Sequence, residues 1–365
     1  MSVKVIISGG GTGGHIFPAI SIANELKERI ADIDILFVGA KGRMEMEKVP
    51  KAGYSILGLD INGLQRNWRD KRNLIFPFKL IKSLWDSYKI VKSFKPNLVI
   101  GTGGYASGPM LYVASRLSIP ALIQEQNSYA GITNKLLAKY VDTICVAYEK
   151  MENFFPQEKI RLLGNPIRQD LLLNDEKKQK AYQFFKLDES KPVIVVVGGS
   201  LGARTINHCI ALLLDKIEQN DLQLIWQTGL SYYETASKMC NDRPTLICQA
   251  FIYEMDLLYS VADVIISRAG ASTISELCMV GKPTILIPSP NVAEDHQTKN
   301  AMALVNSNAA LIVTDSLAKE QLGNCLFDLL NDDDKRDNLS KNIKSLAIDN
   351  SATLIVDEVE KLLHL

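Results

Sequence analysis

Glycine-rich loops occur at three places in the chain, and each follows a short apolar run. The segments are VKVIISGGGTGGH (3–15), NLVIGTGGYASGP (97–109) and VIVVVGGSLGAR (193–204). Glycine lets the backbone approach a ligand closely, and the free N–H groups at the start of the following helix favour an anion. Because the first and third segments lie about half a chain apart, the pattern predicts a phosphorylated ligand gripped between two α/β domains.

His15 follows the first glycine loop, at the predicted start of a helix. The positive end of a helix dipole disfavours a charged imidazole, which suits a neutral general base. A histidine that only caps or packs the helix is the alternative interpretation. We take His15 as the first candidate for a catalytic base and Glu125, in the QEQN segment after a predicted strand, as the second.

Polar residues follow several predicted strands in the second half as well. The GGSLGAR loop offers Ser200 and backbone N–H groups to a diphosphate, although a plain tight turn has the same pattern. Glu276 lies in the first turns of a predicted helix, where a carboxylate accepts both ribose hydroxyls or simply complements the helix dipole. The cluster EDHQTKNA (294–301) follows a strand exit and suits sugar hydroxyls.

A nicotinamide dehydrogenase is the weakest candidate class. Gly9, Gly11 and Gly14 match G-x-G-x-x-G, but the second strand ends FVGAK (37–41), without the acid that holds a ribose in such folds. The six cysteines show no C-x-x-C, and no His, Cys, Asp and Glu cluster has metal-ligand spacing. We therefore expect no metal and no cofactor, with diphosphate charge met by helix N-termini and an arginine.

The elements that must position these residues alternate between apolar strands and amphipathic helices, which predicts mostly parallel sheets covered on both faces. We expect a hinge at 156–166 and an amphipathic terminal helix from Ile343 to Leu363. The predicted strands are 3–8, 33–39, 98–101, 121–124 and 143–147 in the first half, and 193–197, 222–227, 246–249, 264–267 and 284–288 in the second.

Composition limits the partners. Lys+Arg and Asp+Glu both number 41, so no net charge draws the chain to nucleic acid. No stretch reaches the roughly 18 apolar residues that span a bilayer.

Segment 66–95 departs from the even balance of charges in the whole chain. It has nine Lys/Arg against two Asp, with many interleaved apolar residues. It is either a helix that buries its apolar face on its own sheet or a basic, aromatic patch for an anionic membrane surface.

Taken together, the motifs resemble the MurG family, bacterial transferases that add N-acetylglucosamine (GlcNAc) from UDP-GlcNAc to undecaprenyl-pyrophosphoryl-MurNAc-pentapeptide, turning lipid I into lipid II. Each motif alone is common, whereas the set in family order is specific. The matching segments are GGGTGGHIFPA (9–19), GTGGYASGP (101–109), QEQNSYAGITNKLLA (124–138), GNPIR (164–168), GGSLGAR (198–204), SRAGASTISE (267–276) and HQTKNA (296–301).

The resemblance implies a GT-B fold, two Rossmann-like domains whose parallel sheets face a cleft. Residues 1–163 would bind the acceptor and the membrane, with helix 343–365 packed back on them, and 164–342 would bind UDP-GlcNAc. The implied donor-site residues are Thr12, Gly13, Gly14, Asn127, Arg168, Ser200, Ile252 through its backbone, Ala271, Ser272, Glu276 at the ribose, and Gln297; we assign Gly103, Gly104 and Tyr105 to the acceptor side.

The implied reaction is a single displacement with inversion in peptidoglycan synthesis, and thus in cell shape and division. It would take place at the cytoplasmic face of the bacterial inner membrane, with lipid I and UDP-GlcNAc as ligands and other cell-wall enzymes as candidate partners. Two rivals share the fold: a transferase acting on another lipid acceptor such as diacylglycerol, and a non-hydrolysing UDP-GlcNAc 2-epimerase. His296 stands where family members often carry glutamine, and Trp68 stands in a loop expected to hold small residues.

Overall fold

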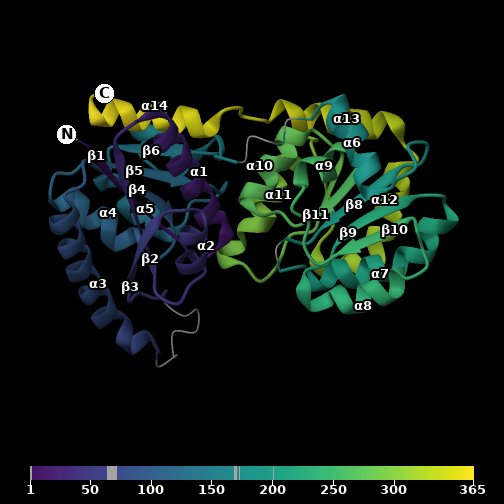
Figure 1. Cartoon of the computed structure of the whole chain (residues 1–365), viewed down its shortest axis with the longest axis horizontal. Coiled ribbons are helices and arrows are strands. Elements are labelled where there is room, and N and C mark those ends of the chain that lie inside the picture. The colour runs from purple at the N-terminus through teal and green to yellow at the C-terminus, as the bar shows by residue number, and fades with distance from the viewer. Residues whose placement is uncertain (1, 64–71, 168–170, 172, 200) are drawn as a thin grey trace. The chain divides into compact units, whose positions relative to one another are not determined.

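The chain folds into two compact units (Figure 1). Residues Met1–Ile167 and Ile348–Leu365 form the first unit, and Arg168–Ala347 form the second. The computed structural model describes the chain except residues 1, 64–71, 168–170, 172 and 200. The candidate residues Arg168 and Ser200, and the loop that holds Trp68, therefore lie outside the described residues.

The first unit contains a seven-stranded parallel sheet in the order β3-β2-β1-β4-β5-β6-β7. All five strands predicted in this half form. The two missed strands are edge strands with exposed positions, so they lack the continuous apolar run of a central strand. The strands are β1 (Val3–Gly9), β2 (Ile33–Ala40), β3 (Ser55–Leu59), β4 (Leu98–Gly103), β5 (Ala121–Glu125), β6 (Thr143–Val146) and β7 (Ile160–Leu162).

The predicted hinge at 156–166 is wrong for its central part, because β7 lies inside it and pairs with β6. Two prolines flank that segment, and they suggested a linker rather than an edge strand. Helices cover both faces of the sheet, since alternate β1 residues enter different apolar clusters, Ile6 in one and Val5 with Ile7 in the other. The helices are α1 (Gly13–Arg29), α2 (Glu45–Lys51), α3 (Arg72–Phe94), α4 (Ser107–Arg116), α5 (Ile132–Leu137) and α14 (Ser351–Leu363).

The C-terminal segment is not the single helix that its apolar period predicted. α13 (Asp333–Ser345) ends in the second unit, and α14 begins in the first. Asn350 has φ 56°, a left-handed conformation that asparagine tolerates and that interrupts a helix. α14 packs against α1, where Arg29 pairs with Asp357 and Glu360 at 2.6 Å each (Figure 1).

The second unit has a six-stranded parallel sheet in the order β10-β9-β8-β11-β12-β13. The five predicted strands form, and the missed one has two residues. The strands are β8 (Val193–Val197), β9 (Gln223–Gln227), β10 (Leu246–Gln249), β11 (Val264–Ser267), β12 (Thr284–Leu286) and β13 (Leu311–Ile312). Besides α13, the helices of this unit are α6 (Asp175–Phe185), α7 (Arg204–Gln219), α8 (Leu230–Cys240), α9 (Met255–Ser260), α10 (Ala271–Val280), α11 (His296–Val305) and α12 (Ala318–Leu330). The prediction of two Rossmann-like domains is confirmed.

Candidate active site

Each sheet has one point where the chain reverses its direction of strand addition. It lies between β1 and β4 in the first unit and between β8 and β11 in the second. Ligands of open parallel sheets bind beyond the strand C-termini at such points. The glycine segments after β1, β4 and β8 all lie there, so the fold places the predicted loops where a nucleotide or phosphate is expected.

The loops after β1 and β4 touch through their backbones. Gly10 N–H donates to the carbonyl of Gly103 at 3.2 Å. Gly104 has φ 86°, and a Cβ there would lie 2.3 Å from the Gly10 carbonyl oxygen. A Cβ on Gly103 would lie 2.7 Å from Nδ1 of His15. Glycine at both positions is thus what lets the second loop pass beside the first and beside the imidazole.

Thr12 is the N-cap of α1, and its carbonyl accepts from the N–H of His15 at 3.1 Å. Gly13 and Gly14 form the first turn, whose N–H groups have no acceptor within a helix. The Thr12 side chain makes no capping hydrogen bond and is exposed. This helix start therefore presents backbone donors and a hydroxyl beside His15.

Glu45, at the start of α2, is a loop-holding residue that the sequence analysis missed. It is 1% exposed. One carboxylate oxygen accepts from Gly11 N–H and the other from Ala40 N–H, both at 2.9 Å. Glu45 thereby fixes the first glycine loop to the end of β2. Its only sequence signal was an acid beside an apolar helix start, which also fits ordinary helix capping.

The hydrogen-bond network around His15 fixes the tautomer of its ring. Gln126, directly after β5, donates through Nε2 to the carbonyls of Thr102 at 2.7 Å and Gln124 at 2.9 Å. Its Oε1 therefore faces Nδ1 of His15 at 2.8 Å. An amide oxygen only accepts, so Nδ1 carries the proton and Nε2 holds the lone pair.

Glu125, the second candidate base, is 1% exposed, and both of its oxygens are occupied. Oε1 accepts from the backbone and side-chain N–H groups of Asn127 at 3.0 and 3.2 Å. Oε2 accepts from Gly131 N–H at 3.0 Å and from Asn134 Nδ2 at 2.8 Å. These four hydrogen bonds tie together the loop 125–134.

In the second unit, α10 begins directly after the β11 exit, with Gly270 as N-cap. Ala271 opens the helix. The Ser272 hydroxyl is buried, and it has no hydrogen-bond partner among the described residues. Glu276 lies a turn further, where the Tyr259 hydroxyl donates to Oε2 at 3.5 Å, a long contact. This helix start thus combines backbone donors, an unpaired hydroxyl and a carboxylate.

Two glutamines bridge neighbouring strand exits of this sheet. Gln227 at the end of β9 accepts from Ile252 N–H at 2.9 Å and donates to the Gly199 carbonyl at 3.1 Å. Gln297 in α11 accepts through Oε1 from the N–H groups of Ala269 at 3.3 Å and Ser289 at 2.8 Å. Gln297 was predicted as a site residue, whereas Gln227 was missed.

Arg268 is a further residue that was not predicted from the sequence. Its guanidinium donates to the carbonyls of Ile287 at 2.9 Å and Pro288 at 3.1 Å and pairs with Asp315. These contacts join the β11 and β12 exits. The following segment is strained, since Glu294 and Asp295 have φ of 51° and 54°. It leads into α11, where His296 Nε2 lies 3.5 Å from Glu294.

The predicted site residues therefore form two sets. Thr12, Gly13, Gly14 and His15 gather with Gly103, Gly104, Tyr105, Glu125 and Asn127 at the β1, β4 and β5 exits of the first unit. Ile252, Ala271, Ser272, Glu276 and Gln297 gather at the β10, β11 and β12 exits of the second. In the part of the chain that the structure describes, no three His, Cys, Asp or Glu side chains could hold a metal ion together.

Two Rossmann-like units with helix starts and glycine loops at their switch points are the architecture of the GT-B fold. Residues 5–146 match the glycosyltransferase family 28 N-terminal domain, and residues 193–358 match the corresponding C-terminal domain. The chain belongs to the MurG family of these glycosyltransferases, because it is similar over nearly its whole length to a curated relative and to a solved structure of that family.

One relative, from Flavobacterium psychrophilum, is the UDP-N-acetylglucosamine–N-acetylmuramyl-(pentapeptide) pyrophosphoryl-undecaprenol N-acetylglucosamine transferase. It is 55% identical over 361 residues, which cover 99% of this chain and 98% of the relative. The crystal structure of Acinetobacter baumannii MurG superposes with a TM-score of 0.80 at 30% identity, over 98% and 99% of the two chains. A UDP-N-acetylglucosamine 2-epimerase structure, at 14% identity and a TM-score of 0.64 over 99% and 96% of the two chains, shares the fold alone.

Proposed function

We propose that the protein transfers GlcNAc from UDP-GlcNAc to the MurNAc 4-hydroxyl of lipid I, making lipid II for peptidoglycan. The observation that carries the proposal is the 55% identity, over 99% of the chain, to a transferase of that name. The first unit would bind the acceptor and the second unit the donor. The epimerase alternative rests on a shared fold at 14% identity, so it is not favoured.

In this proposal, Nε2 of His15 takes the proton of the MurNAc 4-hydroxyl as its oxygen attacks C1 of GlcNAc. The bond from C1 to the UDP oxygen breaks, and the configuration at C1 inverts. The tautomer set by Gln126 supports this role, because it leaves the lone pair on Nε2. The N–H groups of Gly13 and Gly14 would stabilise negative charge nearby, beside an acceptor edge formed by Gly103, Gly104 and Tyr105.

Glu125 becomes the less favoured base, because each of its two carboxylate oxygens already accepts two hydrogen bonds from N–H donors. We propose that it shapes the loop that presents Asn127 to the sugar. This assignment leaves His15 as the residue on which general-base catalysis depends.

On the donor side, Glu276 would accept the two ribose hydroxyls. The N–H of Ile252 is held by Gln227, so contact with uracil would fall to its carbonyl oxygen. The unpaired Ser272 hydroxyl and Nε2 of Gln297 would meet GlcNAc or phosphate oxygens beside Ala271. Arg168 and Ser200 keep their sequence-based assignment to the diphosphate.

The test is the acceptor dependence of UDP release. The protein is incubated with UDP-GlcNAc alone, with a lipid I analogue, and with diacylglycerol. We expect UDP to form only with the lipid I analogue. Formation of UDP-ManNAc without acceptor would instead establish an epimerase, and UDP release with diacylglycerol would establish the other lipid transferase.

In this proposal Gln126 acts through His15. Replacing Gln126 should therefore lower kcat only while the imidazole of His15 is present. We expect Gln126→Leu to lower kcat by about two- to twelvefold, the size of one hydrogen bond of 0.5–1.5 kcal/mol, with donor affinity unchanged. The double variant with His15→Ala should be no slower than His15→Ala alone. Losses that multiply in the double variant would show that Gln126 acts independently of His15.

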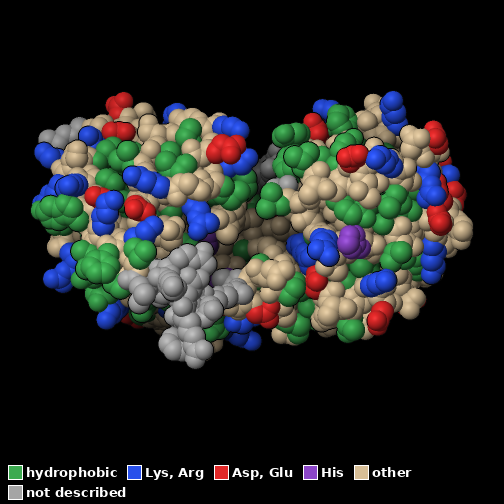
Figure 2. All heavy atoms as spheres, turned by 90° about the horizontal axis from the view of Figure 1, so that it is seen from below, with side chains coloured by type: hydrophobic (Ala, Val, Ile, Leu, Met, Phe, Trp, Pro, Cys, Tyr) green, Lys and Arg blue, Asp and Glu red, His purple; other side chains and the backbone are tan. Residues whose placement is uncertain are grey.

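Membrane association is the second part of the proposal. No helix in the described ranges is long and apolar enough to cross a bilayer. α3 instead presents an apolar, basic face: Phe78 is 73%, Ile81 66% and Trp85 58% exposed. Trp85 stacks on Tyr88 at 5.8 Å, and Lys89 lies 5.4 Å from the Trp85 ring. In Figure 2, hydrophobic and basic side chains lie side by side on the part of the first unit that carries α3.

One face of α3, including Ser83, Ser87 and Val91, is buried, as expected for a helix that packs an apolar face on its own sheet. The exposure of Phe78, Ile81 and Trp85 on the rest of the helix favours the membrane interpretation of segment 66–95. Phe76, in the first turns of the same helix, is half-buried. We propose that this face holds the protein peripherally on anionic lipid at the cytoplasmic side of the inner membrane.

We expect Phe78→Ser with Trp85→Ser to reduce co-sedimentation with anionic vesicles severalfold, and added salt to weaken the binding of the parent protein by screening the lysines. Donor affinity should stay unchanged. Leu212→Ser is the matched control, because Leu212 is 62% exposed on α7 of the other unit. Equal vesicle binding by the α3 variant and the parent protein would rule out α3 as the membrane surface.

A further inference from the structure

Two of the six cysteines are held close together on the second unit, where both line one pocket. Cys240 ends α8, and Cys248 lies in β10, an edge strand. The turn between them is fixed by hydrogen bonds from Arg243 N–H to the Cys240 carbonyl at 3.2 Å and from Leu246 N–H to the Arg243 carbonyl at 3.0 Å. The Arg243 guanidinium pairs with Asp215 at 2.8 Å.

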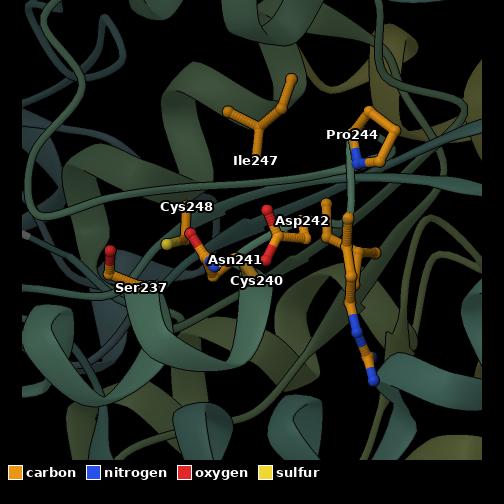
Figure 3. Close-up of a pocket in the computed structure, with 9 residues that line it drawn as sticks. Ser237, Cys240, Asn241, Asp242, Pro244, Ile247 and Cys248 are labelled. Carbon is orange, nitrogen blue, oxygen red and sulfur yellow. Dashed lines mark hydrogen bonds between the residues drawn. The ribbon is translucent and has the colours of Figure 1, made fainter.

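Both cysteines line one open pocket of about 550 Å³, together with Ser237 and Asp242 (Figure 3). Cys240 is buried and Cys248 is half-buried. The Cys240 thiol donates a side-chain hydrogen bond to the Cys248 sulfur, which lowers the pKa of Cys248. The same bond and burial raise the pKa of Cys240. A small oxidant can therefore reach the more acidic of two neighbouring thiols.

We propose that Cys240 and Cys248 are an oxidation site that closes to an intramolecular disulfide when the protein meets a peroxide. The Cys248 thiolate attacks one peroxide oxygen, the O–O bond breaks, and a sulfenic acid and hydroxide form. The Cys240 sulfur then attacks the Cys248 sulfur, the S–O bond breaks, and the Cys240 proton leaves with the hydroxide as water. Overall the two thiols lose two electrons and two protons, and hydrogen peroxide becomes two waters.

The other four cysteines are poorer targets. Burial raises the pKa of Cys145, of Cys209, of Cys325, and of Cys278 to about 12, so their thiolate populations are small. A reversible disulfide in a cytoplasmic protein is a redox-responsive feature rather than a structural one.

The experiment treats the purified full-length protein with graded hydrogen peroxide, blocks remaining thiols with N-ethylmaleimide under denaturing conditions, and maps the peptides by mass spectrometry. We expect one disulfide, between Cys240 and Cys248, that dithiothreitol reverses, with the other four cysteines alkylated. Cys240→Ser should leave a sulfenic acid at Cys248 that dimedone traps. Cys325→Ser is the control, because Cys325 is also half-buried in this unit, and it should leave the disulfide unchanged.

Recovery of Cys240 and Cys248 as alkylated thiols, while peroxide oxidises methionine or other cysteines, would overturn the proposal. Conversion of Cys248 to a sulfinic acid without the disulfide in the parent protein would also overturn it. Because peptide mapping of the parent protein decides both outcomes, the test does not depend on the folding of either variant.

Discussion

Replacing His15 by alanine is expected to lower kcat by about 10²–10⁴-fold, the usual contribution of a general base. The fold and most of the donor affinity should be retained, because His15 is half-buried and its imidazole hydrogen bond is to Gln126. Steady-state kinetics with saturating lipid I analogue measures this effect.

His208→Ala is the control for this variant, since His208 is an exposed histidine on α7 of the second unit, with its ring 5.5 Å from the Tyr232 ring. It should leave kcat unchanged. If His15→Ala instead raises the acceptor KM and keeps kcat near the parental value, then His15 binds the acceptor diphosphate and is not the base. Glu125 would then need to be tested as the base despite its four donors.

Replacing Glu276 by alanine is expected to weaken UDP-GlcNAc binding at least about tenfold. A hydrogen bond to a charged group contributes about 1.5–3 kcal/mol, and two ribose hydroxyls would be lost as partners. The Tyr259 hydroxyl donates to Oε2 of this carboxylate at 3.5 Å, which is long for a hydrogen bond. Calorimetry with UDP-GlcNAc measures the change.

Glu320→Ala is the matched control, because Glu320 is an exposed acid in the first turn of α12 in the same unit. It removes a carboxylate of equal charge without touching the strand exits, so donor affinity should be unchanged. Unchanged affinity in Glu276→Ala itself would remove Glu276 from the donor site and leave the helix-dipole interpretation of its position.

The central strands could be predicted from the sequence because buried parallel strands are continuous apolar runs followed by glycine. β1 and β8 are of this kind, and their glycine loops fall at the switch points where they were expected. The short edge strands β7 and β13 carry no such signal. The break between α13 and α14 depends on the left-handed Asn350, which the apolar period of the helix does not report.

Site residues could be predicted where a local sequence motif places them, as the glycine loop places His15. They could not be predicted where their role depends on a contact between residues far apart in the sequence. Glu45 holds Gly11 across 34 positions of sequence, and Gln126 sets the tautomer of His15 across 111. Such contacts depend on which strands become neighbours in the sheet, and a single sequence does not encode that adjacency in any local pattern.

The most direct measurement of the proposed function is the structure of the product. The protein is incubated with labelled UDP-GlcNAc and a lipid I analogue, and the lipid product is isolated and analysed by NMR. The account predicts a disaccharide lipid with GlcNAc joined through a β-1,4 linkage to MurNAc, inverted relative to the α-linked donor. A product with retained α configuration, a linkage to another hydroxyl, or labelled UDP-ManNAc with no disaccharide lipid would contradict it.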